Sequence, residues 1–402
     1  MGSKHTDMKK IAYRSQNVRE TLVELKDVSE LAVDLGYAAT LYDFPGLAEE
    51  VLELEDRADS LQYPAKIALM LAAKRSTDAE QLVGIIQIVE AAVTITNAAG
   101  DIAAVLTDGV GLPAEVRAAL PDADEMVMRA TVSEDSDAVG KTLGDLAFDI
   151  EAGVSAIAIR RGKEWHIAPG EDTVVEAGDI VIGSGSDAGV ATVRERLTGE
   201  PGGGKPSPTP DVEALERASE LVVDLKNISE LAVGLSYAAV LFDDADLASE
   251  VHDLEARSDS VKNEIETLVI GAGDQVTEPA KLRGLLHLAT ASEVICDAAA
   301  SIADIVLRDG RVHPVFGQAI GESDELITTA TVDPESRLAD ATLGELELEE
   351  DTGMVIMAID RNDEWVMDPG GDTTIRSGDV LIARGPQDGV GILRSWTQRK
   401  EE

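Results

Sequence analysis

The sequence predicts an α+β protein built from two tandem units, each a three-helix bundle followed by a small α/β domain. First, the string LKDVSELAVDLGYAA from Leu25 returns as LKNISELAVGLSYAA from Leu225, 200 residues later. Second, in each copy the apolar residues recur first at helical spacing and then at strand spacing. Third, a segment rich in Gly and Pro separates the copies. Internal repetition of this kind sets the architecture before any motif is considered.

The repeat extends over nearly the whole chain. Other residues keep the same offset, apart from a one-residue slip around Leu106 and Leu307. The matched pairs are Trp165 and Trp365, Pro169 and Pro369, Asp172 and Asp372, and Asp179 and Asp379. Residues 199–210, GEPGGGKPSPTP, hold too much Gly and Pro for a helix or a central strand. We therefore expect a linker that lets the halves fold separately and then pair.

The first part of each copy, residues 17–120 and 211–320, is expected to be helical. Apolar residues follow steps of three and four along Leu25, Val28, Ala32, Leu35, Ala39 and Tyr42, and along Leu225, Ile228, Ala232, Leu235, Ala239 and Phe242. Two further helices are expected at about 47–73 and 79–107. The breaks fall at Pro45-Gly46 and near residues 76–78. The stripe of apolar residues must face other helices, which predicts a bundle.

The second part of each copy, residues 123–198 and 323–396, changes to strand spacing. EMVMRATV from Glu125 alternates as a strand, and TLGDLAF suits a short helix. VSAIAIRR and KEWHIA predict a hairpin around Gly162. GDIVIGSG predicts a buried strand, which Gly178-Asp179 introduces as a turn and a helix through 190–197 follows.

These second parts resemble the TrkA-C module, the C-terminal half of a domain that regulates potassium conductance. The resemblance rests on several features in combination: Ala130-Thr131-Val132, Thr142-Leu143-Gly144, IAIRRG at 157–162, Pro169-Gly170 and Gly178-Asp179. The second copy supplies Thr331-Val332, Thr342-Leu343-Gly344, MAIDRN from Met357, Pro369-Gly370 and Gly378-Asp379. Such modules commonly form pairs, so the resemblance implies that the two copies pair within one chain and that the protein is a homo-oligomer.

The helical parts resemble single PhoU repeats, in which an acidic residue and an aspartate four positions apart can hold metal ions. The corresponding pairs here are Glu55 with Asp59 and Glu255 with Asp259. A spacing of four places both carboxylates on one helix face, where they could bind a divalent cation. In a chain this acidic, the same spacing also fits a solvated acidic face. Glu293 and Asp297 form a further pair that is interpreted as incidental, because the first copy has Val93 and Asn97 there.

The charge excludes one class of partner. The chain has 77 Asp and Glu against 34 Lys and Arg, a formal charge of -43 spread along its length. Nucleic acid is not expected to bind, because neutralising phosphates requires clustered Lys and Arg. The acids could form a dedicated polyanionic surface or a whole surface adapted to concentrated salt. The scarcity of Lys relative to Arg favours the second, halophilic interpretation.

The expected compartment is the cytoplasm. Cys296 is the only cysteine, so no disulfide can form within the chain. No apolar segment follows the basic residues Lys9, Lys10 and Arg14, as a secretory signal would require. The most apolar stretch, 83–106, is interrupted by polar residues and is interpreted as a core helix rather than a membrane span.

The basic residues of the hairpin are candidates for binding a small anion. Arg160, Arg161 and His166 lie close together in sequence, and Arg361 is the counterpart of Arg161. TrkA-C-like modules often bind anionic effectors between paired copies, which implies a cyclic dinucleotide as one possible effector. Ordinary surface charge is the competing interpretation.

No catalytic constellation is recognisable. The histidines are scattered at His5, His166, His252, His287 and His313. The glycines of 183–189 have the wrong spacing for a dinucleotide fingerprint, and Ala383 replaces the first of them in the second copy. We therefore expect neither an enzyme nor NAD as a cofactor.

The sequence thus suggests a cytoplasmic, ligand-sensing regulator of potassium or other cation transport. Its expected partner is a membrane cation transporter or channel subunit, without insertion of this chain into the membrane. The alternative is an autonomous sensor of metal ions or cyclic dinucleotides that has no transporter partner.

Overall fold

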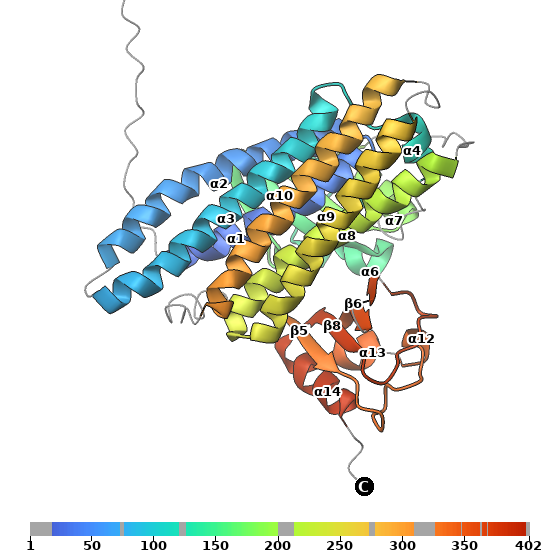
Figure 1. Cartoon of the computed structure of the whole chain (residues 1–402). Coiled ribbons are helices and arrows are strands. Elements are labelled where there is room, and N and C mark those ends of the chain that lie inside the picture. The colour runs from blue at the N-terminus through green and yellow to red at the C-terminus, as the bar shows by residue number, and fades with distance from the viewer. Residues whose placement is uncertain are drawn as a thin grey trace, which may run out of the picture.

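The computed structural model describes residues 18–72, 76–119, 126–199, 213–272, 278–308, 326–346, 348–361, 364–367 and 369–398. Most of the linker between the copies lies outside these ranges. Long helices form one bundle, with the C-terminal α/β domain below it and the N-terminal α/β domain behind it in the view of Figure 1. The predicted α+β class, with a helical part before each small α/β domain, is confirmed.

Each copy contributes three long helices to the bundle. Helical unit 1 consists of α1 (Val18–Leu41), α2 (Pro45–Ala72) and α3 (Ser76–Thr107). Helical unit 2 consists of α8 (Glu213–Phe242), α9 (Ala245–Ala272) and α10 (Leu282–Leu307). Pro45 is the first residue of α2, where its missing N–H has no helical partner to lose. The second break comes slightly earlier than expected, because α2 ends at Ala72 and α3 already begins at Ser76. A short helix, α4 (Ala114–Ala119), follows and was not predicted.

The two helical units pack on each other through reciprocal contacts. Ser29 Oγ lies 2.9 Å from the Tyr237 hydroxyl, and Ser229 Oγ lies 2.8 Å from the Tyr37 hydroxyl. All four side chains are buried. Reciprocity of this kind is expected when two copies are related by an approximate two-fold axis. The axis therefore passes between α1 and α8, inside a single chain.

Two helical segments are long and apolar enough to cross a membrane by length and composition alone, Leu82–Thr107 and Arg217–Phe242. In each, 67% of the most apolar window is buried inside the bundle. Small residues bring such helices close together. A Cβ on Gly84 would stand 3.1 Å from Ile305, and a Cβ on Gly284 would stand 3.1 Å from Val105. The apolar composition of these helices is thus accounted for by packing in the core.

Each α/β domain contains a four-stranded antiparallel sheet. Domain 1 has the strands β1 (Met126–Thr131), β2 (Val154–Arg161), β3 (Glu164–Ile167) and β4 (Ile180–Gly185), in the order β1-β4-β2-β3. Domain 2 repeats this order as β5-β8-β6-β7, with β5 (Leu326–Thr331), β6 (Val355–Arg361), β7 (Glu364–Met367) and β8 (Val380–Gly385). The strands and the hairpin agree with the sequence prediction.

Short helices complete each α/β domain. Domain 1 has α5 (Leu143–Leu146), α6 (Phe148–Ala152) and α7 (Asp187–Thr198). Domain 2 has α12 (Leu343–Leu346), α13 (Leu348–Thr352) and α14 (Gln387–Thr397). The TLGDLAF segment forms two helices rather than one, because Ala147 between them adopts a left-handed conformation with φ 45°.

Both faces of each sheet are covered, by different partners. In domain 1, Met128, Ile159 and Val181 pack against the domain's own helices. Their neighbours on the opposite face, including Ala158 and Ile182, join the core of the helical bundle. The sheet of domain 2 is buried in the same way.

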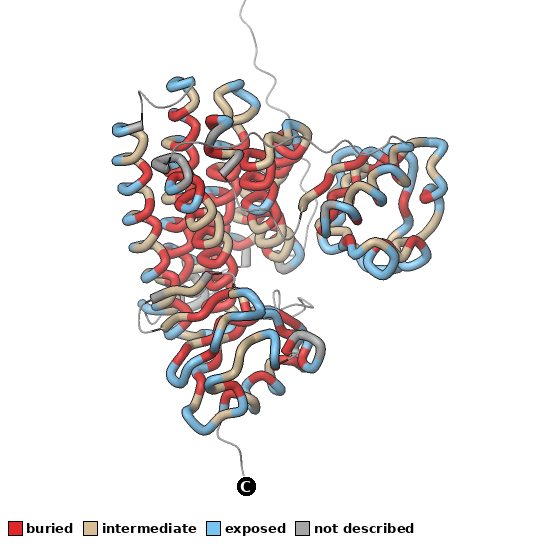
Figure 2. The backbone as a smooth tube through the Cα atoms, turned by 90° about the vertical axis from the view of Figure 1, so that its right-hand side faces the viewer, coloured by how far each residue is buried: buried red, intermediate tan, exposed pale blue. Residues whose placement is uncertain are grey.

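The predicted pairing of the two α/β domains within one chain is wrong in this structure. Figure 2 shows the domains on separate sides of the bundle. In the described part of the chain, β3 packs on α1, and β5 and β7 pack on α8. The physical reason is that the apolar sheet face available for pairing is already buried against the helices.

Candidate functional site

The structure separates the two arginines that the sequence suggested as one anion site. Arg160 and Arg161 are neighbours on β2, so their side chains leave opposite faces of the sheet. Arg160 reaches the helical bundle, whereas Arg161 turns back into its own domain. His166 on β3 is exposed. The proposed ligand residues of domain 1 are therefore not assembled around one cavity.

Arg160 belongs to a buried ion cluster that fastens domain 1 to α2. Glu50 is fully buried and accepts hydrogen bonds from Arg129 Nε at 3.0 Å and from Arg160 Nη2 at 2.8 Å. Arg160 Nε also donates to the second Glu50 oxygen. The Arg160 guanidinium lies 5.8 Å from the centre of the Trp165 ring. We call Glu50, Arg129 and Arg160 the Glu50 cluster.

Arg161 and Arg361 form the same internal ion pair in the two domains. Arg161 donates to both carboxylate oxygens of Asp179 at 2.8 Å, and Arg361 does so to Asp379 at 2.9 and 2.7 Å. Burial works against ionisation of Asp179, but hydrogen bonds from Arg161 and the Glu176 backbone N–H hold its pKa below the ordinary value. The pair ties the β2–β3 hairpin to the turn before β4. Its role is structural, and an anion would have to displace a buried carboxylate.

The second copy lacks the Glu50 cluster. Glu250 corresponds to Glu50, but Thr329 and Asp360 stand in place of Arg129 and Arg160. Glu250 is only partly buried. Asp360 instead lines a small cavity of about 200 Å³ with Trp365 and two residues of α9, Asp253 and Arg257. Docking of domain 2 thus depends on other contacts.

One such contact lies at α8. Ile327 of β5 approaches the helix so closely that a Cβ on Gly234 would stand 2.7 Å from its Cδ1 atom. Trp365 and Met357 also pack on the core of the bundle. Apolar packing on α8 and the bundle core therefore contributes to the docking of domain 2.

In the first copy, the proposed metal residues lie beside a neighbouring helix. Burial raises the pKa of Glu55, and Asp101 on α3 and Asp59 raise it further. The Glu55 carboxylate packs against Gly100, and a Cβ atom at Gly100 would collide with it. One turn before Asp101, the Oδ1 atom of Asn97 is buried without a hydrogen-bond partner in the described part of the chain. Asp59 itself is exposed.

The second copy gathers more carboxylates. Burial raises the pKa of Glu255, and repulsion from the carboxylates of Asp259 and Asp297 raises it further. Burial also raises the pKa of Asp297, and repulsion from Glu293 and Asp259 raises it further. The acidic pair on α10 therefore lies near enough to the pair on α9 for their charges to interact. That the α10 pair is incidental to metal binding stays a prediction. Lys262 pairs with Glu293 and offsets part of this charge.

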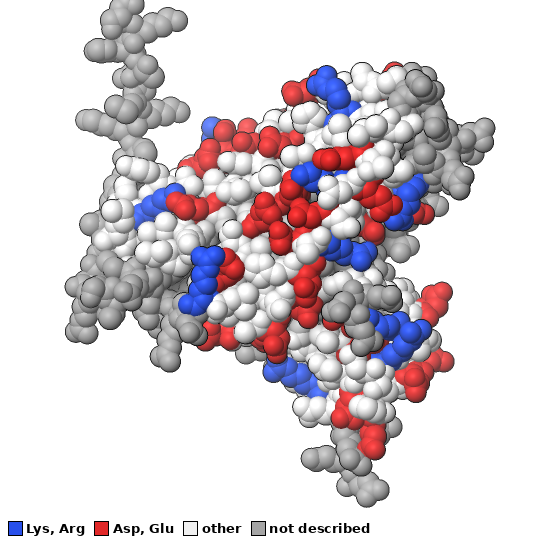
Figure 3. Space-filling view, in the orientation of Figure 1, with Lys and Arg blue, Asp and Glu red and all other residues white. Residues whose placement is uncertain are grey.

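Chemically these groups suit a hard cation, because carboxylate and amide oxygens are the ligands that Mg²⁺ and Ca²⁺ prefer. In the described residues, however, no three His, Cys, Asp or Glu side chains converge closely enough to hold a metal ion. Carboxylate rotamers would have to change for binding. Acidic side chains are also spread widely over the bundle face seen in Figure 3, so local density alone does not mark a site.

Comparison with known families identifies the two kinds of domain. The TrkA-C domain model matches residues 127–198 and 327–397, and the PhoU domain model matches residues 222–306. The chain therefore contains two TrkA-C domains, which are the α/β domains 1 and 2, and a PhoU domain, which coincides with helical unit 2. These are regulatory domains rather than enzyme families. Their combination indicates a regulatory protein linked to ion transport.

Solved structures resemble the chain only distantly. PhoU from Pseudomonas aeruginosa has 14% identity and a TM-score of 0.41, covering 73% of this chain and 96% of that one. The GsuK RCK domain has 14% identity and a TM-score of 0.18, covering 67% of this chain and 62% of that one. The GsuK channel bound to NAD has a TM-score of 0.19 at 14% identity, with 68% and 53% covered. The chain thus spans little more than half of the GsuK structures. No curated protein matches significantly.

Sequence reasoning missed the residues that fix domain 1 to the bundle. Glu50 and Arg160 are 110 positions apart, and no local pattern joins them. A signal did exist between the copies. Both partners of Glu50 change together, Arg129 to Thr329 and Arg160 to Asp360, as expected for residues that share one contact.

Proposed function

We propose that this protein is a cytoplasmic regulator of a membrane cation transporter or channel, with potassium as the first candidate ion. The observation that supports it most is that two TrkA-C domains dock their sheets on one bundle that includes a PhoU domain. In this arrangement, a ligand that changes how a TrkA-C domain sits would change the surface of the bundle. The bundle is then the part that contacts the transporter.

The relevant pairing of TrkA-C domains would be between chains. Within one chain the two domains lie apart, one beside the bundle and one below it, and both carry many exposed residues in Figure 2. A homo-oligomer could bring two such domains together and create an effector site between them. A cyclic dinucleotide is the effector that the family resemblance suggests.

A second function has its own support in the acidic faces of α2–α3 and α9–α10. Carboxylates that raise one another's pKa repel, and a divalent cation would relieve that repulsion. The alternative proposal is therefore an autonomous sensor of divalent metal ions that needs no transporter. Glu55, Asp59, Glu255 and Asp259 would hold the metal.

The test separates the two proposals. The gene is deleted in its own organism, and uptake of rubidium as a potassium tracer is measured over a range of external potassium. Altered uptake that the intact gene restores supports transporter regulation. Unchanged uptake of rubidium and of magnesium contradicts it. Saturable binding of magnesium or manganese to the purified protein in molar potassium chloride supports the metal sensor.

We further propose that the acidic surface is an adaptation to concentrated salt. The excess of negative charge repels itself over about 10 Å at 0.1 M ionic strength and over about 3 Å at 1 M. The melting temperature should therefore rise from low salt to molar potassium chloride. A flat melting temperature over that range would contradict the halophilic interpretation.

A further inference from the structure

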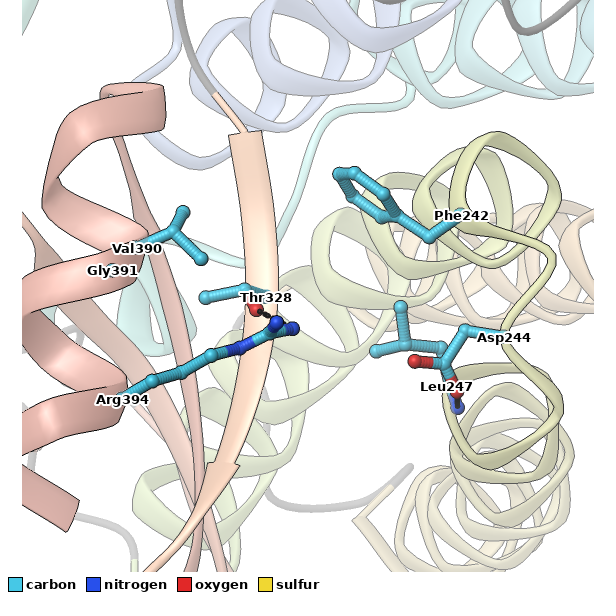
Figure 4. Close-up of a pocket in the computed structure, with 7 residues that line it drawn as sticks. All are labelled: Phe242, Asp244, Leu247, Thr328, Val390, Gly391 and Arg394. Carbon is cyan, nitrogen blue, oxygen red and sulfur yellow. Dashed lines mark hydrogen bonds between the residues drawn. The ribbon is translucent and has the colours of Figure 1, made fainter. Parts of the chain in front are cut away.

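A cavity of about 420 Å³ lies where domain 2 meets the corner between α8 and α9. Phe242, Asp244 and Leu247 form the helical wall, as Figure 4 shows. The opposite wall comes from domain 2: Thr328 on β5, and Val390, Gly391 and Arg394 on α14. We call this space the Arg394 pocket. Its size is within the range of small-molecule sites.

The first copy has bulkier apolar residues at this place. Phe44 stands where the second copy has Asp244, and it packs on the core of the bundle. Met128 stands where the second copy has Thr328, and it is buried in the core of domain 1. Gly391 replaces Ala191, and a Cβ on Gly391 would meet nothing within 4 Å. Phe44 and Met128 of copy 1 thus correspond to the smaller or polar residues Asp244 and Thr328, which line the pocket in copy 2.

The pocket has a basic wall and an acidic wall. Arg394 donates one long hydrogen bond, 3.3 Å, to Thr328 Oγ1. In the described residues no carboxylate forms an ion pair with it, although acids outnumber bases by more than two to one in the chain. A guanidinium has five N–H donors, so most of its capacity remains for a ligand.

The acidic wall is held in place by the start of α9. Asp244 Oδ1 accepts hydrogen bonds from the backbone N–H groups of Asp246 at 2.9 Å and Leu247 at 3.1 Å. This cap fixes the carboxylate on the helical side of the cavity, across from Arg394 in Figure 4. The Phe242 ring is 45% exposed and lies above the space between them, while buried Leu247 forms part of the same wall.

We propose that the Arg394 pocket binds a small zwitterion with an apolar body, such as an α-amino acid with an apolar side chain. Arg394 recognises the carboxylate, and Asp244 recognises the ammonium group. Phe242, Leu247 and Val390 contact the apolar part. This goes beyond the proposed regulation of transport and does not depend on it. One wall belongs to the helical bundle and the other to domain 2. Binding of a ligand to both walls therefore fastens domain 2 to the bundle.

The test uses three probes that differ by one charge. L-phenylalanine carries both charges, 3-phenylpropanoate lacks the ammonium group, and 2-phenylethylamine lacks the carboxylate. Binding to the full chain is measured by calorimetry in molar potassium chloride, with L-leucine as a second zwitterion. We expect saturable binding of a zwitterion and binding at least about tenfold weaker for both singly charged probes. No saturable binding of either amino acid, or equal binding of all three phenyl probes, overturns the proposal.

Variants locate the binding. Arg394→Leu and Asp244→Asn should each weaken zwitterion binding about tenfold or more, and Asn can still cap α9. Asp244→Phe combined with Thr328→Met installs the side chains of the first copy and should abolish binding. Thr328→Met alone covers the case in which the double variant does not fold. Arg194→Leu is the matched control in copy 1 and should change nothing. Binding unaffected by Arg394→Leu, or lost in the Arg194→Leu control, contradicts this location.

Discussion

The two TrkA-C domains dock on the bundle through the same sheet face but by different means. Domain 1 is fastened by the buried Glu50 cluster, and its copy has Phe44, which packs on the bundle core, where copy 2 has Asp244. Domain 2 has Asp360 where Arg160 would be, and at the corner it leaves the Arg394 pocket. The difference suggests that the copies have separate tasks. We infer that domain 1 serves as a fixed part of the scaffold and that domain 2 is the one that responds to a ligand.

Substituting Glu50 should produce the largest effect. Glu50→Gln leaves Arg129 and Arg160 partly buried without their carboxylate, and breaking a buried ion pair costs about 3–5 kcal/mol. We expect a loss of this size in the free energy of unfolding, measured by denaturant titration in molar potassium chloride. Limited proteolysis of this variant should cut at domain 1 about as readily as at domain 2, whereas in the unmodified protein domain 1 should be the more resistant.

Glu250→Gln is the matched control for that experiment. Because Glu250 is only partly buried, its substitution should cost less free energy of unfolding than that of the fully buried Glu50. Equal losses for Glu50→Gln and Glu250→Gln would show that the two domains dock with similar strength.

Where the copies agree, the effects should be equal. Asp179→Asn and Asp379→Asn each remove the charge that Arg161 or Arg361 contacts, at about 2–3 kcal/mol. Because the folded-state pKa of Asp179 is lowered, its stabilisation is present at neutral pH and is lost as the pH falls through that pKa. The Asp179→Asn variant should therefore lose less stability than the unmodified protein on acidification below about pH 4. An unchanged acid dependence would contradict the assigned ion pair.

How much of this could be read from the sequence depended on the range of the interactions. The helices and strands followed from local spacing and from turn residues such as Gly162 and Gly178. Docking could not be predicted in the same way, because Glu50 and its arginines meet only after folding. The family resemblance suggested paired TrkA-C domains, but burial of both sheet faces was invisible without the structure. Arg160 and Arg161 looked like one basic site, and alternation along β2 sends them to different partners.

The acidic faces should give the smallest effects on stability. Asp59 is exposed, so Asp59→Asn should change the free energy of unfolding by no more than about 0.5 kcal/mol in metal-free buffer. Asp259 has more carboxylates near it than Asp59 has. Asp259→Asn should therefore raise the free energy of unfolding slightly, because it relieves their repulsion.

If a divalent metal binds, either substitution should weaken binding. Because the pKa values of Glu55 and Glu255 are raised, protons should compete with the metal as the pH falls. Calorimetric titrations with magnesium, calcium and manganese at two pH values test both points. Equal binding by the Asp59→Asn, Asp259→Asn double variant would remove the proposed metal site.

The unequal docking of the two domains is tested most directly by native-state hydrogen exchange on the full chain. The amides of β2 and β6 occupy equivalent central positions in their sheets, so each pair of matched residues serves as its own comparison. We predict exchange in β2 at least about tenfold slower than in β6, and we predict that Glu50→Gln removes the difference. Equal protection of β2 and β6 in the unmodified protein would contradict the account.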